Sequence, residues 1–156
     1  MVEDKFKSFK EHGFRRDAQV RALNKFKWDA ITISNLGSVD DYIERAKCGV
    51  SGFVYKDCLI IAAIRFGADS KLLAVLKSIA LDKSNNDDFV LEHLYNIRQY
   101  CAMVLYCLNT EDSKRAFDEV MATFDFEERE FVFEMVKDKY WDIWTELLPK
   151  YFKKSK

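Results

Sequence analysis

The sequence contains few of the residues that build tight turns, and this excludes most folds made of short strands. Its 156 residues include one proline and five glycines, too few for the many turns of a sandwich or barrel. Hydrophobic residues still make up 49% of the chain and aromatic residues 15%, enough for a core that needs no disulfide or metal. We therefore expect an all-α fold: a single-domain, irregular helical bundle of about six to eight helices.

Histidine is equally scarce, which limits the catalytic and metal sites that the chain can form. The two histidines are His12 and His93, and neither has the spacing of a metal motif. On a continuous helix His93 and Cys101 would lie about 12 Å apart, too far for a nucleophile and its base. Segment 49–52 lacks the Gly-Lys-Ser/Thr ending of a phosphate-binding loop. We predict a non-enzymatic protein with no catalytic residue, no metal and no cofactor.

Long apolar runs are absent as well. The longest, Cys58–Ile64, is about a third of the ~20 residues that a membrane-spanning helix needs. The first residues are charged, unlike the apolar segment of a secretion signal. The four cysteines, Cys48, Cys58, Cys101 and Cys107, lack the paired spacing of a zinc site. We expect four free thiols and a cytoplasmic or otherwise intracellular protein that does not bind membranes.

Charges of both signs are present, and their distribution is uneven. The formal net charge is −1, made up of +4 over residues 1–28, −2 over 29–110, −7 over 111–149 and +4 over 150–156. We therefore divide the chain into a basic, aromatic-rich N-terminal helical segment (1–37), a helical core (38–149) and a basic tail (150–156).

Helix starts are indicated by side chains that can accept hydrogen bonds from first-turn amides. The candidate caps, each followed by apolar residues at helical spacing, are Ser38, Asp57, Asp87, Thr110 and Asp125. Ser38 with Asp41, and Asp125 with Glu128, have the spacing of a capping box. The helix after Asp87 would span ~20 residues with a break near Asn96, and the last helix would cover residues 126–148. Segment 28–34 is interpreted as an irregular or helical link.

Two segments repeat the same plan 43 residues apart. Residues 58–79 align without a gap on residues 101–122, so that Asp69-Ser70-Lys71 matches Asp112-Ser113-Lys114. Each segment indicates a helical hairpin, and the offset resembles the two-helix repeats of the HEAT and armadillo families. This resemblance implies a solenoid of stacked hairpins. Because the second helices of the two segments match poorly, we favour the compact bundle and keep a duplicated, solenoid-like hairpin as the alternative.

The last predicted helix carries the first candidate binding surface. Carboxylates recur there every four residues, at Glu130, Glu134, Asp138, Asp142 and Glu146. Trp141 and Trp144 belong to the same helix, and we expect at least one of them to be partly exposed beside the acidic row. A solvated acidic face is the alternative interpretation. The favoured function is a protein-interaction or regulatory module with a basic protein partner, and a second copy of the chain is the nearest candidate.

The basic N-terminal segment is the second candidate surface, and it would bind nucleic acid. Its cations alternate with aromatic residues, a mixture suited to phosphate contacts and base stacking. They are Lys5, Lys7, Lys10, Arg15, Arg16, Arg21, Lys25 and Lys27. The rest of the chain has a net charge of −5, which would repel nucleic acid. A nucleic-acid-binding regulator is therefore the alternative to protein binding.

The compartment assignment makes a testable prediction about redox state. Mass spectrometry of the native protein under non-reducing conditions should find all four cysteines as thiols. A stoichiometric disulfide would overturn the prediction of an intracellular protein.

Overall fold

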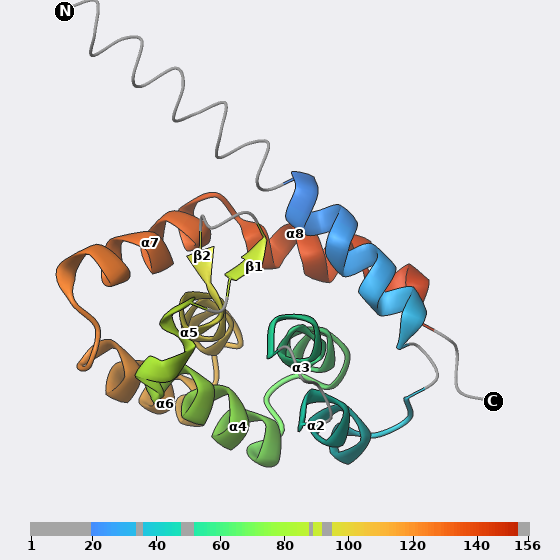
Figure 1. Ribbon diagram of the computed structural model, residues 1–156, viewed down its shortest axis with the longest axis horizontal. Helices are drawn as coiled ribbons and strands as arrows, with labels where there is room; N and C mark the ends of the chain where they lie inside the picture. The colour runs from blue at the N-terminus through green and yellow to red at the C-terminus, as the bar shows by residue number, and fades with distance from the viewer. Residues whose placement is uncertain (1–19, 34–35, 48–51, 88, 92–94, 153–156) are drawn as a thin grey trace, which may run out of the picture.

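The computed structural model describes residues 20–33, 36–47, 52–87, 89–91 and 95–152. These ranges hold eight α-helices, which confirms the predicted all-α bundle (Figure 1). The helices are residues 20–32, α2 (Val39–Lys47), α3 (Gly52–Phe66), α4 (Ser70–Leu81), α5 (Ile97–Cys107), α6 (Glu111–Met121), α7 (Phe126–Lys137) and α8 (Tyr140–Leu147). The shorter elements are η1 (Lys83–Asp87), β1 (Phe89–Leu91), β2 (Tyr95–Asn96) and η2 (Pro149–Tyr151). None of the helices described is long and apolar enough to cross a membrane.

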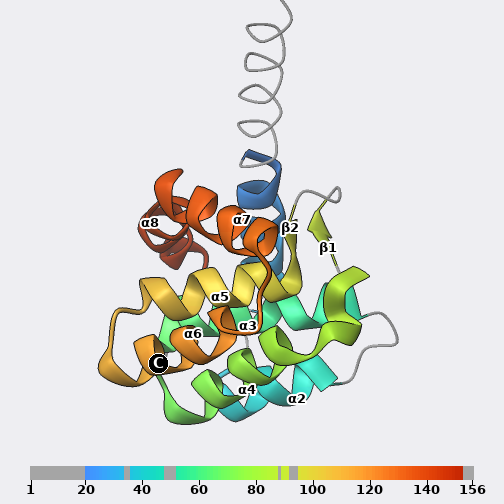
Figure 2. The same cartoon turned by 90° about the vertical axis from the view of Figure 1, so that its left-hand side faces the viewer.

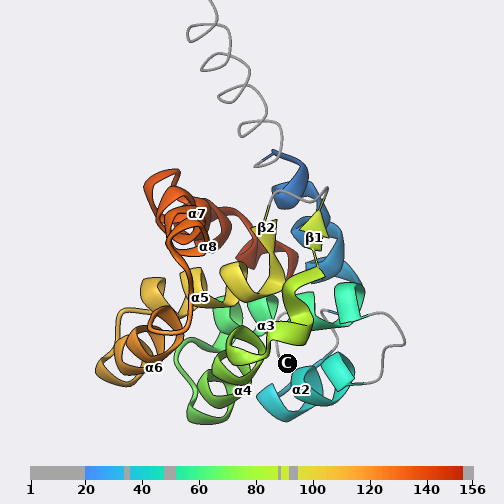
Figure 3. The ribbon, with the colours of Figure 1, turned by 60° about the vertical axis from the view of Figure 1, so that its left-hand side comes forward.

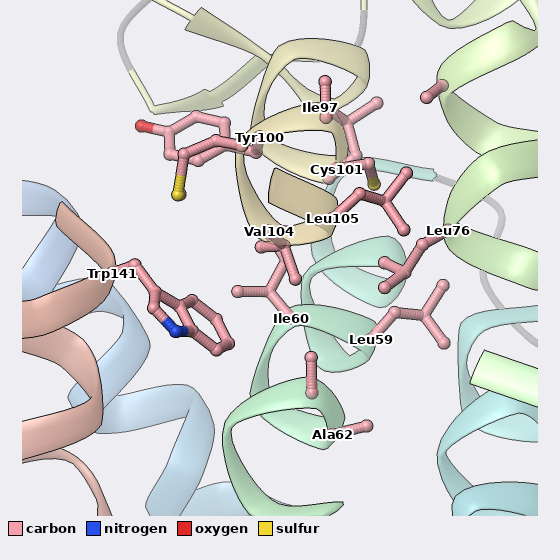
Figure 4. Close-up of a cluster of buried hydrophobic side chains, with 14 of the residues drawn as sticks. Leu59, Ile60, Ala62, Leu76, Ile97, Tyr100, Cys101, Val104, Leu105 and Trp141 are labelled. Atoms are coloured by element: carbon pink, nitrogen blue, oxygen red, sulfur yellow. The ribbon is translucent and has the colours of Figure 1, made fainter. Parts of the chain in front are cut away.

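Helix α5 lies at the centre of the bundle. Every residue of Ile97–Leu105 is buried, as expected for a helix that other helices surround. It contacts α3, α4, α6, α7 and α8, with α7 and α8 on one side and α2, α3, α4 and α6 on the other (Figure 2). Val104 and Leu105 of α5 lie close to Ile60 of α3 and Leu76 of α4 (Figure 4). All the other helices are therefore placed by how they pack on or around α5.

The described part of the N-terminal segment packs on the same core. Ala22, Phe26 and Ala30 recur every four residues along the helix 20–32, and all three are fully buried. The ring of Phe26 lies 4.5 Å from that of Trp144 on α8. The predicted link over residues 28–34 is helical as far as residue 32.

The two predicted helical hairpins, α3–α4 and α5–α6, are both present. The residues that align between them, however, have different roles. Asp69 caps α4 by accepting hydrogen bonds from the amides of Lys71 and Leu72. The aligned Asp112 lies inside the first turn of α6, whose cap is Thr110. Since the capping residues are not equivalent, the duplication stays a prediction.

Three of the predicted caps are confirmed, and each acts over a few residues. Ser38 Oγ accepts from the amide of Asp41 at 3.2 Å, although Asp41 accepts in return from Gly37 instead of Ser38. Thr110 and Asp125 each form a complete capping box.

Two predicted helix starts are wrong. The helix α3 begins at Gly52, so Asp57 lies inside it, because neither proline nor glycine interrupts the residues between them. The segment after Asp87 forms an antiparallel pair of strands, with Phe89 opposite Asn96 and Leu91 opposite Tyr95. The predicted break near Asn96 is confirmed.

Asn96 explains why α5 starts where it does. Its side chain accepts from the amide of Gln99 at 3.0 Å, and the Gln99 side chain accepts from the amide of Asn96 at 2.8 Å. This capping box places the helix start at Ile97. The residues before it therefore pair as strands instead of lengthening the helix.

The predicted single helix over residues 126–148 is also wrong. The helix α7 ends at Lys137, and Lys139 adopts a left-handed conformation with φ of 61° before α8 begins at Tyr140. The turn lets Tyr140, Trp141 and Trp144 enter the core. A straight continuation would carry these rings away from it, so burial of the aromatic residues outweighs the cost of the left-handed residue.

A buried ion pair connects α5 to the first turn of α7. The Arg98 side chain is 1% exposed and pairs with Glu128 at 2.8 Å. Its Nε donates to the carbonyl of Ala80, at the end of α4, at 2.7 Å, and its guanidinium lies 4.8 Å from the centre of the Phe124 ring. The second oxygen of Glu128 accepts from the amide of Asp125 in the capping box. One carboxylate thus caps α7 and neutralises a buried cation.

The ion pair predicts a difference between two neighbouring glutamates. Glu128→Gln keeps a capping acceptor but removes the charge that faces Arg98, and we expect the free energy of unfolding to fall by about 1.5–3 kcal/mol. Glu127→Gln, at an exposed position, should change it by less than about 0.5 kcal/mol. Chemical denaturation measures both values. Equal losses would show that the Arg98 pair is not the source of stability.

Candidate partner-binding surface

The structure divides the predicted acidic row between two helices. Glu130 and Glu134 lie on α7, Asp138 forms its C-cap, and Asp142 and Glu146 lie on α8. Because the chain turns at residue 139, the five carboxylates do not share one helical face. The prediction that the row follows one continuous helix is therefore wrong, and the role of these carboxylates in partner binding stays a prediction.

The tryptophans of the row are buried as well. Trp141 is 9% exposed and Trp144 is 0% exposed, so the prediction of an exposed tryptophan beside the row is wrong. The Trp144 ring stacks on that of Tyr100 with their centres 5.8 Å apart. The Trp141 ring is directed toward Ile60 and Val104 (Figure 4). Both residues contribute to the core, and Trp141 also lines the cleft described below.

The exposed aromatic residues of this region are phenylalanines, and they lie on the outer side of α7. Phe126 is 77% exposed and Phe133 is 47% exposed. They are seven residues apart with Glu130 between them, and this spacing places all three on one face. We define the α7 outer face by its six residues, Phe126, Glu127, Glu130, Phe133, Glu134 and Lys137. Figure 3 shows α7 at the edge of the bundle.

The scaffold holds this face in a defined position. Val132 and Met135 are fully buried on the opposite side of α7, which packs on α5. The Arg129 side chain donates to the carbonyl of Met121 at 2.9 Å, joining α7 to the end of α6. Together with the Asp125 cap, these contacts fix the direction in which the outer face points.

A chain of aromatic contacts extends the face toward α5. The ring of Phe133 meets that of Phe117 edge-on, with their centres 6.3 Å apart. Phe117 in turn lies 5.1 Å from Tyr106, which is partly exposed. Phe133 is therefore supported from below while its outer side remains accessible.

A polar cleft lies beside the C-terminal end of α7. It has a volume of about 380 Å³ and is lined by Tyr106, Cys107, Asn109, Lys114, Val136, Lys139, Trp141 and Asp142. Two of these, Asn109 (φ 56°) and Lys139 (φ 61°), have left-handed backbones. The cleft thus forms where two interhelical turns meet. Its lining carries two lysines, Lys114 and Lys139, and the carboxylate of Asp142.

The cysteine in this cleft is a poor nucleophile. Burial, and to a lesser extent the negative charge of Asp142, together raise the pKa of the Cys107 thiol from 9.0 to about 12. The thiol therefore stays protonated at neutral pH, which does not favour thiolate chemistry. Cys58 and Cys101 are buried thiols that form no disulfide, and Cys58 donates to the carbonyl of Tyr42 at 3.2 Å.

The remaining candidate residues for chemistry are only partly covered by the structure. Cys48, His12 and His93 lie outside the described residues. Among the residues that are described, no three histidine, cysteine or acidic side chains are grouped so that they could hold a metal ion.

Most of the basic candidates for nucleic-acid binding also lie outside the described residues. These are Lys5, Lys7, Lys10, Arg15 and Arg16. The other three, Arg21, Lys25 and Lys27, lie on the helix 20–32. Lys25 pairs with Asp29 at 2.9 Å, and the ammonium of Lys27 lies 5.2 Å from the centre of the Tyr151 ring. Lys25 and Lys27 are thus engaged within the fold.

The α7 outer face was missed by sequence reasoning, although a signal for it exists. The prediction followed acidic residues four apart and overlooked aromatic residues seven apart, which also share a helical face. Phe126 follows the Asp125 cap directly, so it occupies the first helical position. A ring in the first turn opposite Val132 could have been recognised as exposed.

The raised pKa of Cys107 predicts its reactivity. Relative to a thiol of pKa 9.0, one of pKa about 12 has about 1,000-fold less thiolate below pH 9, so iodoacetamide should alkylate native Cys107 far more slowly than the unfolded chain. The rate should rise steadily as the pH approaches 12. Asp142→Asn removes one of the two causes and should accelerate the reaction, whereas Glu146→Gln on the same helix should not. Peptide mapping after timed labelling follows Cys107 alone, and a native rate equal to the unfolded one would contradict the assignment.

Comparison with known proteins gives no relative for this arrangement. Neither the models of protein families nor the curated proteins and solved structures that were searched contain a match to the chain. The functional conclusion therefore depends on the geometry of the surfaces themselves.

Proposed function

We propose that the protein is a non-enzymatic interaction module that binds a basic segment of a protein partner through the α7 outer face. The observation that carries this proposal is the pair of exposed phenylalanines, Phe126 and Phe133, on either side of Glu130. Helix α7 carries four glutamates and two cations, Arg129 and Lys137. An apolar pair within an excess of negative charge favours a partner segment that is both basic and amphipathic.

The energetics of the face support a role in binding. Full burial of a phenylalanine side chain is worth about 1.5–3 kcal/mol, so two rings provide apolar anchors of the kind that dominate interface energies. The surrounding carboxylates contribute mainly to orientation and association rate, because they remain at the rim in contact with water. Anchors and rim therefore have separate roles, which mutation can test separately.

The face is also preformed. Helix α7 is capped at Asp125, linked to Arg98 through Glu128 and supported at Phe133 by Phe117. A binding surface that is already ordered loses little conformational entropy when a partner docks. This rigidity supports recognition by a helix face of the module, with the partner segment adapting to it.

A peptide experiment tests the proposal. The probe is a synthetic 14-residue amphipathic peptide of lysine and leucine at helical spacing, and its counterpart has glutamate at every lysine position. Fluorescence anisotropy should show the full-length chain binding the basic peptide and not the acidic one, with an affinity that falls as salt is added. Phe126→Ser with Phe133→Ser should weaken binding at least tenfold.

Two further variants separate the contributions. Glu130→Lys with Glu134→Lys should reduce both the affinity and its dependence on salt. Leu81→Ser with Leu147→Ser, which changes two partly exposed apolar residues elsewhere, should leave binding unchanged. Failure of the basic peptide to bind, or equal binding by the phenylalanine variant, would overturn the proposal.

A further inference from the structure

The helix 20–32 has an outer face with the properties that the proposed partner requires. Val20, Trp28 and Ile31 lie on the side opposite its buried residues, and Trp28 is 65% exposed. Arg21 lies next to them on the helix surface. This face, defined by Val20, Arg21, Trp28 and Ile31, is named the basic outer face.

The charges of the two helices are opposite. The helix 20–32 carries Arg21, Lys25 and Lys27 against Asp29, a net charge of about +2, while the four glutamates of α7 exceed its two cations by about 2. The exposed apolar side chains span about three turns on the helix 20–32 and about two turns on α7, so the faces are opposite in charge and alike in apolar character.

These two faces belong to different sides of the molecule. In Figures 1 and 3 the helix 20–32 and α7 lie apart, at separate edges of the bundle. Within one chain they therefore cannot cover each other. A second copy can bring its basic outer face to the α7 outer face of the first.

We propose that the basic partner is a second copy of this chain, whose basic outer face docks on the α7 outer face. This inference depends on the function proposed above, because it names the partner of the same surface. The contact is heterologous: a pair of copies keeps one unused basic outer face and one unused α7 outer face. Association therefore continues to longer assemblies or closes into a ring, and it strengthens at low salt because both faces are charged.

Complementary variants provide the test. Trp28→Glu places a negative charge on the basic outer face, and Phe126→Lys places a positive charge on the α7 outer face. Size-exclusion chromatography with light scattering at low salt should show wild type above the monomer mass in a concentration-dependent manner. Each variant alone should be monomeric, and circular dichroism should show that both remain helical. Leu147→Glu, a matched change at another partly exposed apolar residue, should still associate.

Mixing the two variants gives the decisive measurement. Trp28→Glu retains an intact α7 outer face, and Phe126→Lys retains an intact basic outer face, so one contact can form between them. The mixture should reach twice the monomer mass and go no further. A wild type that stays monomeric, or a mixture that does not pair, overturns the proposal. A monomeric wild type that still binds the lysine–leucine peptide would leave the function proposed above intact, and loss of peptide binding as well would remove both.

Discussion

The pairing of Arg98 with Glu128 is the constraint from which the position of α7 follows. A guanidinium inside a helical core is unfavourable unless an opposite charge and hydrogen-bond acceptors compensate it. Here the acceptors come from the end of α4 and the first turn of α7. Because Arg98 lies within the buried residues Ile97–Leu105 of α5, α7 takes the position that brings Glu128 to the cation. That position directs Phe126 and Phe133 away from the core.

The left-handed turn at Lys139 has a related effect. A continuous helix would keep the carboxylates in one row and would spread the aromatic rings around its circumference. The turn instead gives the two helices different structural roles. Helix α8 places Trp144 beside Phe26 and Tyr100, and α7 retains the exposed phenylalanines. The core thus gains three aromatic residues from α8, and the surface keeps a short, defined face. Packing of the N-terminal helix and exposure of the α7 face are consequences of the same turn.

Three of the five predicted helix caps were confirmed, whereas interactions between distant residues were not predicted from the sequence. The caps at Ser38, Thr110 and Asp125 act within three residues, so spacing alone identifies them. The strand pair at 89–96 and the break at Lys139 depend on what the rest of the chain buries. Composition also cannot rank aromatic residues by exposure, since Trp144 is buried by contact with Phe26 from the opposite end of the chain.

Exposure of the Phe126 ring to water is unfavourable, and the fold does not require a phenylalanine at this position. The ring occupies the first turn of a helix whose cap is already complete, so a polar residue would serve the fold equally well at that position. Large exposed apolar side chains promote association in solution, and soluble domains usually carry few of them in one place. Glutamates next to Phe126 and Phe133 on α7 reduce indiscriminate association, because they repel acidic surfaces and admit basic ones. The exposure of Phe126 therefore supports the proposed selective binding and does not serve the stability of the isolated chain.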